Sequence, residues 1–349
     1  MARGACPMLP IFESIGEPML IFVIKRILQL IPIIILLSFV TFVIINLPPG
    51  DFLTTYINNL RQSGAEITDE YIKALEARYG LNEPFMVQYY KWFTSFLSGN
   101  MGYSFEWNRN VNDLIAERLG NTIFLSFSSI ILIWLVAFPL GFYSATHQYT
   151  APDYIFTSVS FLGMSIPEFL FALVVMWIYF SFTGNFQSGM YAPEFSGQPL
   201  SWAKFASMVK YMWMPYMIIV ITGTAGLFKT FRANLLDELG KPYVMAARAK
   251  GVPRRKLLIK YPVRIALIPF ISTVGWMLPA LISGQTLLAI VMGLPTVAPL
   301  LQKSLRSQDM FLAGSILFIL CILTVIGTVI SDILLAITDP RMRESISKG

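Results

Sequence analysis

The sequence predicts an all-α, polytopic membrane protein with six transmembrane helices. Hydrophobic residues make up 55% of its 349 residues, whereas Asp, Glu, Lys and Arg together make up only 13%. Soluble proteins carry about 25% charged residues, so this shortage of charge indicates a lipid environment. The apolar residues form six continuous runs, each long enough for the roughly 20 residues that a helix needs to cross a bilayer. Continuous apolar sequence favours helices over the alternating strands of a membrane barrel.

The predicted spans divide the chain into regions. The spans are Leu20–Leu47, Asn121–Tyr143, Tyr154–Phe182, Tyr211–Phe228, Ala266–Met292 and Phe311–Ile337. We expect an N-terminal extension (1–19), the first span (20–47), an extracytoplasmic loop region (48–120) and a core transmembrane domain (121–349). The first apolar run does not end in a small-residue cleavage site, so we expect no cleaved signal peptide. Met1 and Met19 remain alternative starting points.

Basic residues predict the orientation of the chain. The connection between spans four and five, about 229–265, is strongly basic and contains only two acids, Asp237 and Glu238. Its basic residues are Lys229, Arg232, Lys241, Arg248, Lys250, Arg254, Arg255, Lys256, Lys260 and Arg264. Further basic residues precede the first span and follow the last: Lys25, Arg26, Arg341, Arg343 and Lys348. The positive-inside rule therefore places this connection and both termini in the cytoplasm, and the net acidic loop 48–120 outside. The net charge of +6 is a topology signal and does not indicate nucleic acid.

The outer loop region is long enough to contain structure of its own. We expect a short helix over Asp69–Tyr79, with Thr68 as its N-cap. The segment Gln88–Phe96 is amphipathic and rich in aromatic residues. Such residues are typical of a membrane interface, which we favour over a role in ligand stacking.

The sequence offers no catalytic or metal-binding set. The two cysteines, Cys6 and Cys321, are far apart, and the chain contains a single histidine, His147, in a short polar loop after span two. No helical histidine pair, Gly-x-Ser-x-Gly motif or glycine-rich phosphate loop occurs. Acids inside a membrane are candidates for function, which applies to Glu168 and Asp332. We expect both near the cytoplasmic ends of their spans, where a charge is tolerated.

The basic connection itself is expected to fold. Lys241–Lys250 predicts a short helix with Pro242 in its first turn and Gly251 as its stop. A second basic helix is expected over Pro253–Lys260, leading into span five. Small residues flanked by long cations suit docking of a partner protein, and they equally suit contact with lipid headgroups. The residues alone leave these two interpretations open.

Five short motifs occur in order along nearly the whole chain from Met19. They are Ile24-Lys25-Arg26-Ile27-Leu28 with Pro49-Gly50-Asp51, Gly99-Asn100-Met101-Gly102-Tyr103-Ser104, Leu119-Gly120-Asn121-Thr122, Gly163-Met164-Ser165-Ile166-Pro167 and Asp339-Pro340-Arg341-Met342-Arg343. Together they resemble the B-type inner-membrane permease subunits of bacterial ATP-binding-cassette (ABC) importers for dipeptides and oligopeptides. The resemblance implies the type I ABC importer permease fold in a bacterial or archaeal cytoplasmic membrane.

The segment Tyr243–Gly251 resembles the cytoplasmic Glu-Ala-Ala-x-x-x-Gly motif of these permeases. The resemblance implies a coupling helix that contacts the ATPase subunit through Tyr243, Met245, Ala246, Ala247, Arg248, Ala249, Lys250 and Gly251. The sequence departs from the family pattern at three places. Met245 and Ala289 stand where many members have Glu, and Tyr261-Pro262-Val263-Arg264 replaces the apolar ending of the motif.

The resemblance also implies an assembly. Its parts are a second permease chain, identical or homologous, two ATP-binding subunits and an extracytoplasmic solute-binding protein. ATP and Mg²⁺ are then held by the partner ATPase subunits, and this chain itself carries no cofactor, metal or catalytic residue. Prolines within the spans, such as Pro269 and Pro279, allow bends beside a cavity. Peptides are the expected substrates, with oligosaccharides or nickel as alternatives. A secondary transporter without an ATPase is a further alternative, but the spans lack its paired charges.

Overall fold

The computed structural model describes residues 16–47, 83–104, 106–199, 201–272 and 285–338. Long helices dominate these residues. They are α1 (Gly16–Asn46), α5 (Val111–Thr146), α6 (Ala151–Ser165), α7 (Glu168–Thr183), α8 (Trp202–Leu239) and α15 (Met310–Thr338). The shorter elements are α4 (Phe85–Leu97), β1 (Tyr103–Ser104), β2 (Arg109–Asn110), η1 (Pro193–Phe195), α9 (Pro242–Ala249), α10 (Arg254–Lys260), α11 (Pro262–Ser272), α13 (Thr286–Val291) and α14 (Val297–Arg306).

Four of the described helices, α1, α5, α8 and α15, are long and apolar enough to cross a bilayer, and a fifth span is counted if α6 and α7 are taken together. The predicted fifth span, Ala266–Met292, begins in α11 and ends at α13, but residues 273–284 between them, with Pro279, lie outside the described residues. The chain is therefore a multi-pass helical membrane protein, and the count of six spans remains a prediction.

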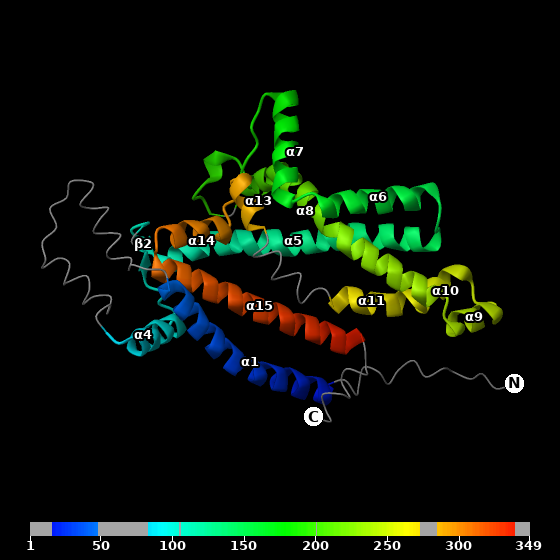
Figure 1. The fold of residues 1–349 in the computed structure, drawn as a ribbon, viewed down its shortest axis with the longest axis horizontal. Coiled ribbons are helices and arrows are strands. Elements are labelled where there is room, and N and C mark those ends of the chain that lie inside the picture. The colour runs from blue at the N-terminus through cyan, green and yellow to red at the C-terminus, as the bar shows by residue number, and fades with distance from the viewer. Residues whose placement is uncertain (1–15, 48–82, 105, 200, 273–284, 339–349) are drawn as a thin grey trace, which may run out of the picture.

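Helix α8 is the centre of the arrangement and packs against α5, α6 and α11 (Figure 1). Its contact with α5 is close because glycine replaces a side chain at the crossings. A Cβ on Gly141 would lie 2.9 Å from the ring of Phe231, and one on Gly223 would lie 2.6 Å from Ile133. The main hydrophobic core forms around these crossings, and Phe231 and Ile133 are fully buried there.

The other two long helices, α1 and α15, run side by side (Figure 1). An ion pair of 2.6 Å between Arg26 and Asp332 joins them. Further along, Phe42, Ile45 and Phe318 form a separate core with Trp92 of α4. Thus the amphipathic segment predicted over 88–96 is a helix, and one side of it packs on two spans. The predicted helix Asp69–Tyr79 lies outside the described residues.

The predicted third span, Tyr154–Phe182, is not one continuous helix. The chain breaks between α6 and α7 with a bend of 104°, and α7 projects from the bundle (Figure 1). Ile166 takes up an extended conformation (φ −98°, ψ 124°) before Pro167, as expected for the residue that precedes a proline. The residues on both sides of the break are apolar, so a search for apolar runs does not detect it.

Two spans begin earlier than their apolar runs. Helix α5 starts at Val111 instead of Asn121, and α8 covers Trp202–Leu239 instead of Tyr211–Phe228. Their additional turns contain charged residues, such as Asp113, Glu117 and Lys204, among the apolar ones, so a search for continuous apolar runs misses them. At the same end of the bundle as the start of α5, the buried Asp309 accepts a hydrogen bond of 2.5 Å from Ser104 and joins the β1–β2 hairpin to the start of α15.

Candidate functional site

The basic connection predicted between spans four and five forms two short helices at one end of the bundle (Figure 1). Helix α8 ends at Leu239 and is followed by α9, α10 and α11. Pro242 occupies the first turn of α9, where its missing N–H is not needed. Gly251 has a φ of +71°, a left-handed conformation that favours glycine and ends the helix. The predicted helices Lys241–Lys250 and Pro253–Lys260 are therefore confirmed as structure.

One side of α9 packs against α10. Val244, Ala247 and Leu257 are buried together. Residues at the edge of this cluster are partly buried: Tyr243, Val252, Leu258 and Tyr261. The hydroxyl of Tyr243 also hydrogen-bonds to the carboxylate of Glu238 at the end of α8. Burial, together with this contact, raises the pKa of Tyr243 well above its ordinary value. The cluster thus fixes α9 to both α8 and α10.

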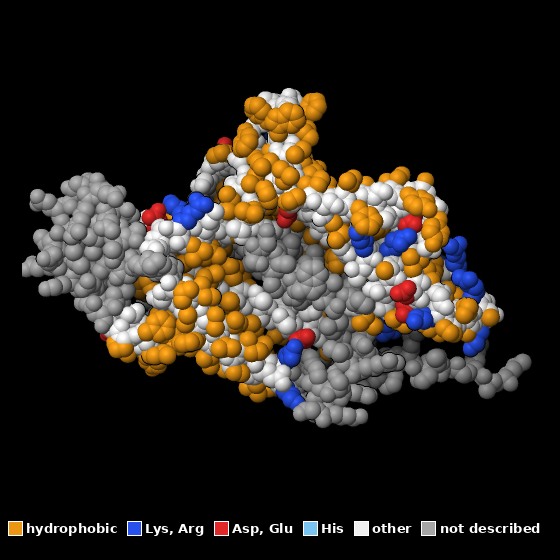
Figure 2. Space-filling view, in the orientation of Figure 1, with side chains coloured by type: hydrophobic (Ala, Val, Ile, Leu, Met, Phe, Trp, Pro, Cys, Tyr) orange, Lys and Arg blue, Asp and Glu red, His pale blue; other side chains and the backbone are white. Residues whose placement is uncertain are grey.

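The opposite side of α9 faces outward. Met245 is 57% exposed, and Ala246 and Ala249 are exposed beside it. Successive helical positions are 100° apart, so these three residues lie on one face. Arg248 and Lys250 are exposed at its borders. Figure 2 shows Lys and Arg side chains gathered at this end of the molecule. We call Met245, Ala246 and Ala249 the outer face of α9.

The structure therefore sorts the predicted site residues into two groups. Tyr243 and Ala247 point toward the α9–α10 cluster and support the helix. The others are exposed: Met245, Ala246, Arg248, Ala249, Lys250 and Gly251. Another backbone can approach closely at Ala246, Ala249 and Gly251, because these residues are small, and the cations Arg248 and Lys250 suit partner carboxylates. Within the described residues, no group of three or more His, Cys, Asp or Glu side chains is placed to hold a metal.

The isolated polar residues that the sequence singles out have different surroundings. His147 is exposed at the end of α5 and stacks on Tyr143 at 4.5 Å. Asp332 is held by Arg26. Glu168 is not near the predicted cytoplasmic end of its span, which is a correction, because all of α6 separates it from the α5–α6 turn. It starts α7 at the break, and among the described residues no hydrogen bond or ion pair holds its carboxylate.

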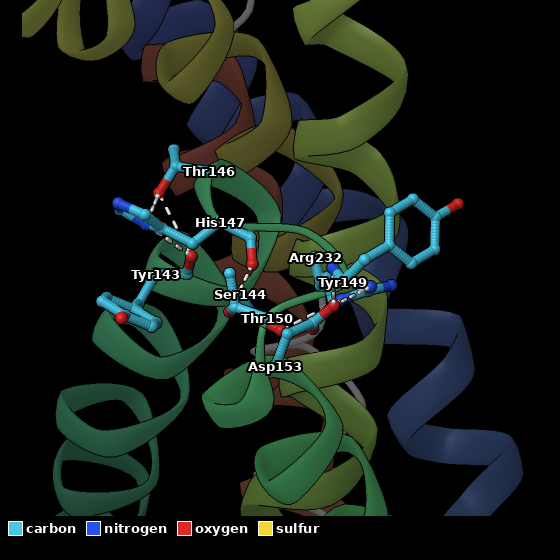
Figure 3. Close-up of polar contacts among 8 residues, drawn as sticks. All are labelled: Tyr143, Ser144, Thr146, His147, Tyr149, Thr150, Asp153 and Arg232. Carbon is cyan, nitrogen blue, oxygen red and sulfur yellow. Dashed lines mark hydrogen bonds and ion pairs between the residues drawn. The ribbon is translucent and has the colours of Figure 1, made fainter.

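A buried polar cluster beside this loop was missed by the sequence analysis (Figure 3). Asp153 in the first turn of α6 forms an ion pair of 2.9 Å with Arg232 of α8. Ser144 near the end of α5 contacts both residues. Sequence analysis counted Arg232 only among the loop cations. Its partner is 79 positions away, and no local spacing signals such a contact.

Comparison with known proteins agrees with this geometry. Residues 137–344 match the family described as "Binding-protein-dependent transport system inner membrane component", and residues 19–126 match the N-terminal model of the same systems. The chain is similar to "Oligopeptide transport system permease protein AppB" of Bacillus subtilis strain 168, with 32% identity covering 92% of this chain and 98% of the relative. It is also similar to "Oligopeptide transport system permease protein OppB" of Haemophilus influenzae, with 29% identity covering 93% of this chain and 100% of the relative. The chain therefore belongs to the family of binding-protein-dependent transport system inner membrane components, the permease subunits of ABC importers.

Proposed function

We propose that this chain and a second permease chain form a path for peptides across a cytoplasmic membrane, driven by two separate ATP-binding subunits. Membership of the permease family supports the transport role. The names of the relatives AppB and OppB support oligopeptides as the substrate class. An extracytoplasmic solute-binding protein delivers the peptide, and the lipid bilayer surrounds the spans.

The observation that carries the coupling role is the outer face of α9. Its small side chains, Ala246 and Ala249, allow the helix to enter a groove of the ATPase subunit. Arg248 and Lys250 at the border then pair with acids of that groove. No acidic residue occurs between Lys241 and Arg264 in this chain, so the loop presents a single sign of charge to its partner.

The inner side of α9 transmits the movement. The cluster of Val244, Ala247 and Leu257 makes α9 and α10 one unit, and the contact between Tyr243 and Glu238 ties this unit to α8. ATP and Mg²⁺, bound by the partner subunits, supply the energy. ATP binding biases one arrangement of the permeases over the other only if the ATPase contacts differ between them. In this chain, the outer face of α9 provides the contact with the ATPase, and the α9–α10 unit passes the movement to α8.

The proposed orientation places α9 in the cytoplasm, following the positive-inside rule. Both termini lie on the same side if α6 and α7 count as one span and Ala266–Met292 as another, which gives the six spans of a type I importer permease. We propose the N-terminal extension 1–19, the outer region 48–120 and the core domain 121–349 as divisions of the sequence; helices α1 and α5 begin within the first two of them, at Gly16 and Val111.

The test is purification of the complex through a tag on this chain. We expect an ATP-hydrolysing subunit to co-purify, and its rate to rise when a peptide-loaded binding protein is added to the reconstituted complex. Binding protein loaded with an oligosaccharide or with nickel is the matched comparison. If only the binding protein loaded with one of those ligands stimulates hydrolysis, that ligand and not a peptide is the substrate. Peptide uptake by a preparation without any ATPase subunit would refute the ABC coupling role.

A further inference from the structure

The end of α5 and the first turn of α6 meet α8 about two turns before α8 ends (Figure 3). Asp153 is the centre of this cluster. Its Oδ1 accepts a hydrogen bond of 2.9 Å from Nε of Arg232, and its Oδ2 accepts one of 2.9 Å from Nη2. The hydroxyl of Ser144 donates to Oδ1, and the N–H of Tyr149 donates to Oδ2 at 3.0 Å. Nε of Arg232 also lies 3.0 Å from the oxygen of Ser144. We call Ser144, Asp153 and Arg232 the clamp.

The clamp is built to hold a single geometry. The side chain of Asp153 is 3% exposed and that of Arg232 is 23% exposed, while Ser144 is fully buried. A planar guanidinium that meets a carboxylate with two parallel bonds fixes distance and orientation together. A buried pair of this kind gives little net stability, because both charges lose their water. Its effect is therefore mainly on which arrangement the helices adopt.

Packing around the clamp opposes sliding of α8 along α5. Gly141, three residues before Ser144, lies against the ring of Phe231, the neighbour of Arg232. A Cβ at Gly141 would also lie 3.6 Å from the backbone nitrogen of Arg232. Thus α5 and α8 are in contact within one helical turn of the ion pair. A shift of α8 by one residue would break the bidentate contact and disturb this packing.

The clamp meets α8 between α9 and the rest of that helix. Arg232 precedes Pro242, the first residue of α9, by ten positions, which corresponds to about 15 Å along a helix. Any displacement of α9 that passes into α8 must first cross the turns that carry Arg232. A displacement that reaches Asp153 can then pass along α6 to the break at Ile166 and to Glu168 at the start of α7.

We propose that Ser144, Asp153 and Arg232 are positioning residues that make the α5–α6 hairpin move together with α8 when α9 is displaced. This inference rests on the proposed function, since it assumes that α9 receives the movement from the ATPase. Without the clamp, α8 moves while the hairpin stays behind. ATP is then hydrolysed without opening the path. A cluster that only stabilises the fold predicts a different result, a parallel loss of assembly, hydrolysis and import.

The experiment compares variants of the chain in the reconstituted full complex. Asp153→Asn removes one charge, and the double variant Asp153→Asn with Arg232→Gln removes both charges, so no unpaired charge stays buried. Arg232→Lys keeps the charge but loses the planar fork. The matched control is Arg26→Gln, which removes an ion pair between two other spans, α1 and α15. The readouts are the co-purified ATPase, the ATP turnover with peptide-loaded binding protein, and the ATP hydrolysed per peptide imported.

We expect the double variant to retain its ATPase subunits and ATP turnover within about twofold of the wild type, while import falls at least tenfold. The ratio of ATP to peptide then rises at least about fivefold, and Arg232→Lys gives an intermediate ratio. The Arg26→Gln control keeps the wild-type ratio. An unchanged ratio in the double variant, with or without loss of assembly, would overturn the inference. Failure of the proposed function is distinguishable, because the wild-type complex itself would then lack ATPase or peptide import.

Discussion

Replacement of Leu257 by Ala tests whether the small cluster between α9 and α10 holds the loop in place. Leu257 is only 2% exposed and is the largest of the three buried side chains in that cluster. Truncation of a buried leucine costs about 2–5 kcal/mol. We take about 2–3 kcal/mol here, because the cavity lies at the edge of the protein and can partly collapse. The spans themselves keep all their contacts.

This loss acts on the local opening of α9 and α10. Each 1.4 kcal/mol is a factor of ten in an equilibrium constant, so the open population of the loop rises about 30- to 150-fold. Trypsin reports this population directly, because exposed basic residues follow one another from Arg248 to Lys260. When opening and closing are fast relative to cleavage, the cleavage rate follows the open population. We therefore expect cleavage in this loop to accelerate about 30- to 150-fold in detergent-solubilised protein.

The matched control is Met245→Ala on the outer face of the same helix. Met245 is 57% exposed, so truncating it removes few contacts. We expect trypsin to cleave the Met245→Ala variant at a rate within about threefold of the wild type. Equal rates for Leu257→Ala and the wild type would show that the buried cluster does not hold α9. If Leu257→Ala and Met245→Ala accelerate tryptic cleavage equally, α9 does not have one buried side and one exposed side.

Three further outcomes are expected. Gly141→Ala places a methyl group against the buried ring of Phe231, so its overpacking cost of about 1–3 kcal/mol exceeds the helix-propensity gain of about 1 kcal/mol. It lowers the melting temperature, whereas Gly226→Ala, which meets nothing within 4 Å, leaves it unchanged or raises it. Burial raises the pKa of Asp309 above its ordinary value despite the hydrogen bond from Ser104, so the folded form binds the proton more tightly than the unfolded form. The melting temperature of the wild type relative to Asp309→Asn is therefore highest below about pH 4, the ordinary range of an aspartate, and falls as the pH rises above it; the opposite trend contradicts the assigned burial. Ala247→Glu buries a charge in the α9–α10 cluster and accelerates tryptic cleavage of the loop, whereas Ala246→Glu, on the outer face, leaves the cleavage rate unchanged.

Local signals explain why the coupling loop is predictable from the sequence. Pro242 and Gly251 bound α9, and both act through the backbone of their own neighbourhood. The spans are predictable for a similar reason, because lipid requires apolar length. Which side of α9 is buried depends on Leu257, a residue of the following helix. The sequence therefore predicted the helix, but it did not predict that Ala247 is buried while the other alanines face outward.

Contacts over long sequence distances were not predictable. The pairing of Asp153 with Arg232 depends on how α6 packs on α8, and neither residue carries a local mark of its partner. The break before Glu168 had a signal in Pro167, but the apolar run on both sides outweighed it. The first turns of α5 contain Asp113 and Glu117, so hydropathy, which detects the apolar part of a span, did not detect where this helix begins.

The proposal that energy enters through the outer face of α9 is tested most directly by Ala246→Glu in the tagged, membrane-inserted chain. The measurement is the amount of ATPase subunit that co-purifies, together with peptide uptake by the reconstituted complex. We expect the variant to insert in normal amounts and to resist trypsin as the wild type does. It should lose at least about 90% of its bound ATPase and its uptake, because a bulky anion replaces a small residue on the outer face, which Arg248 and Lys250 border. Full retention of both ATPase binding and uptake would contradict the assignment of α9 as the coupling helix.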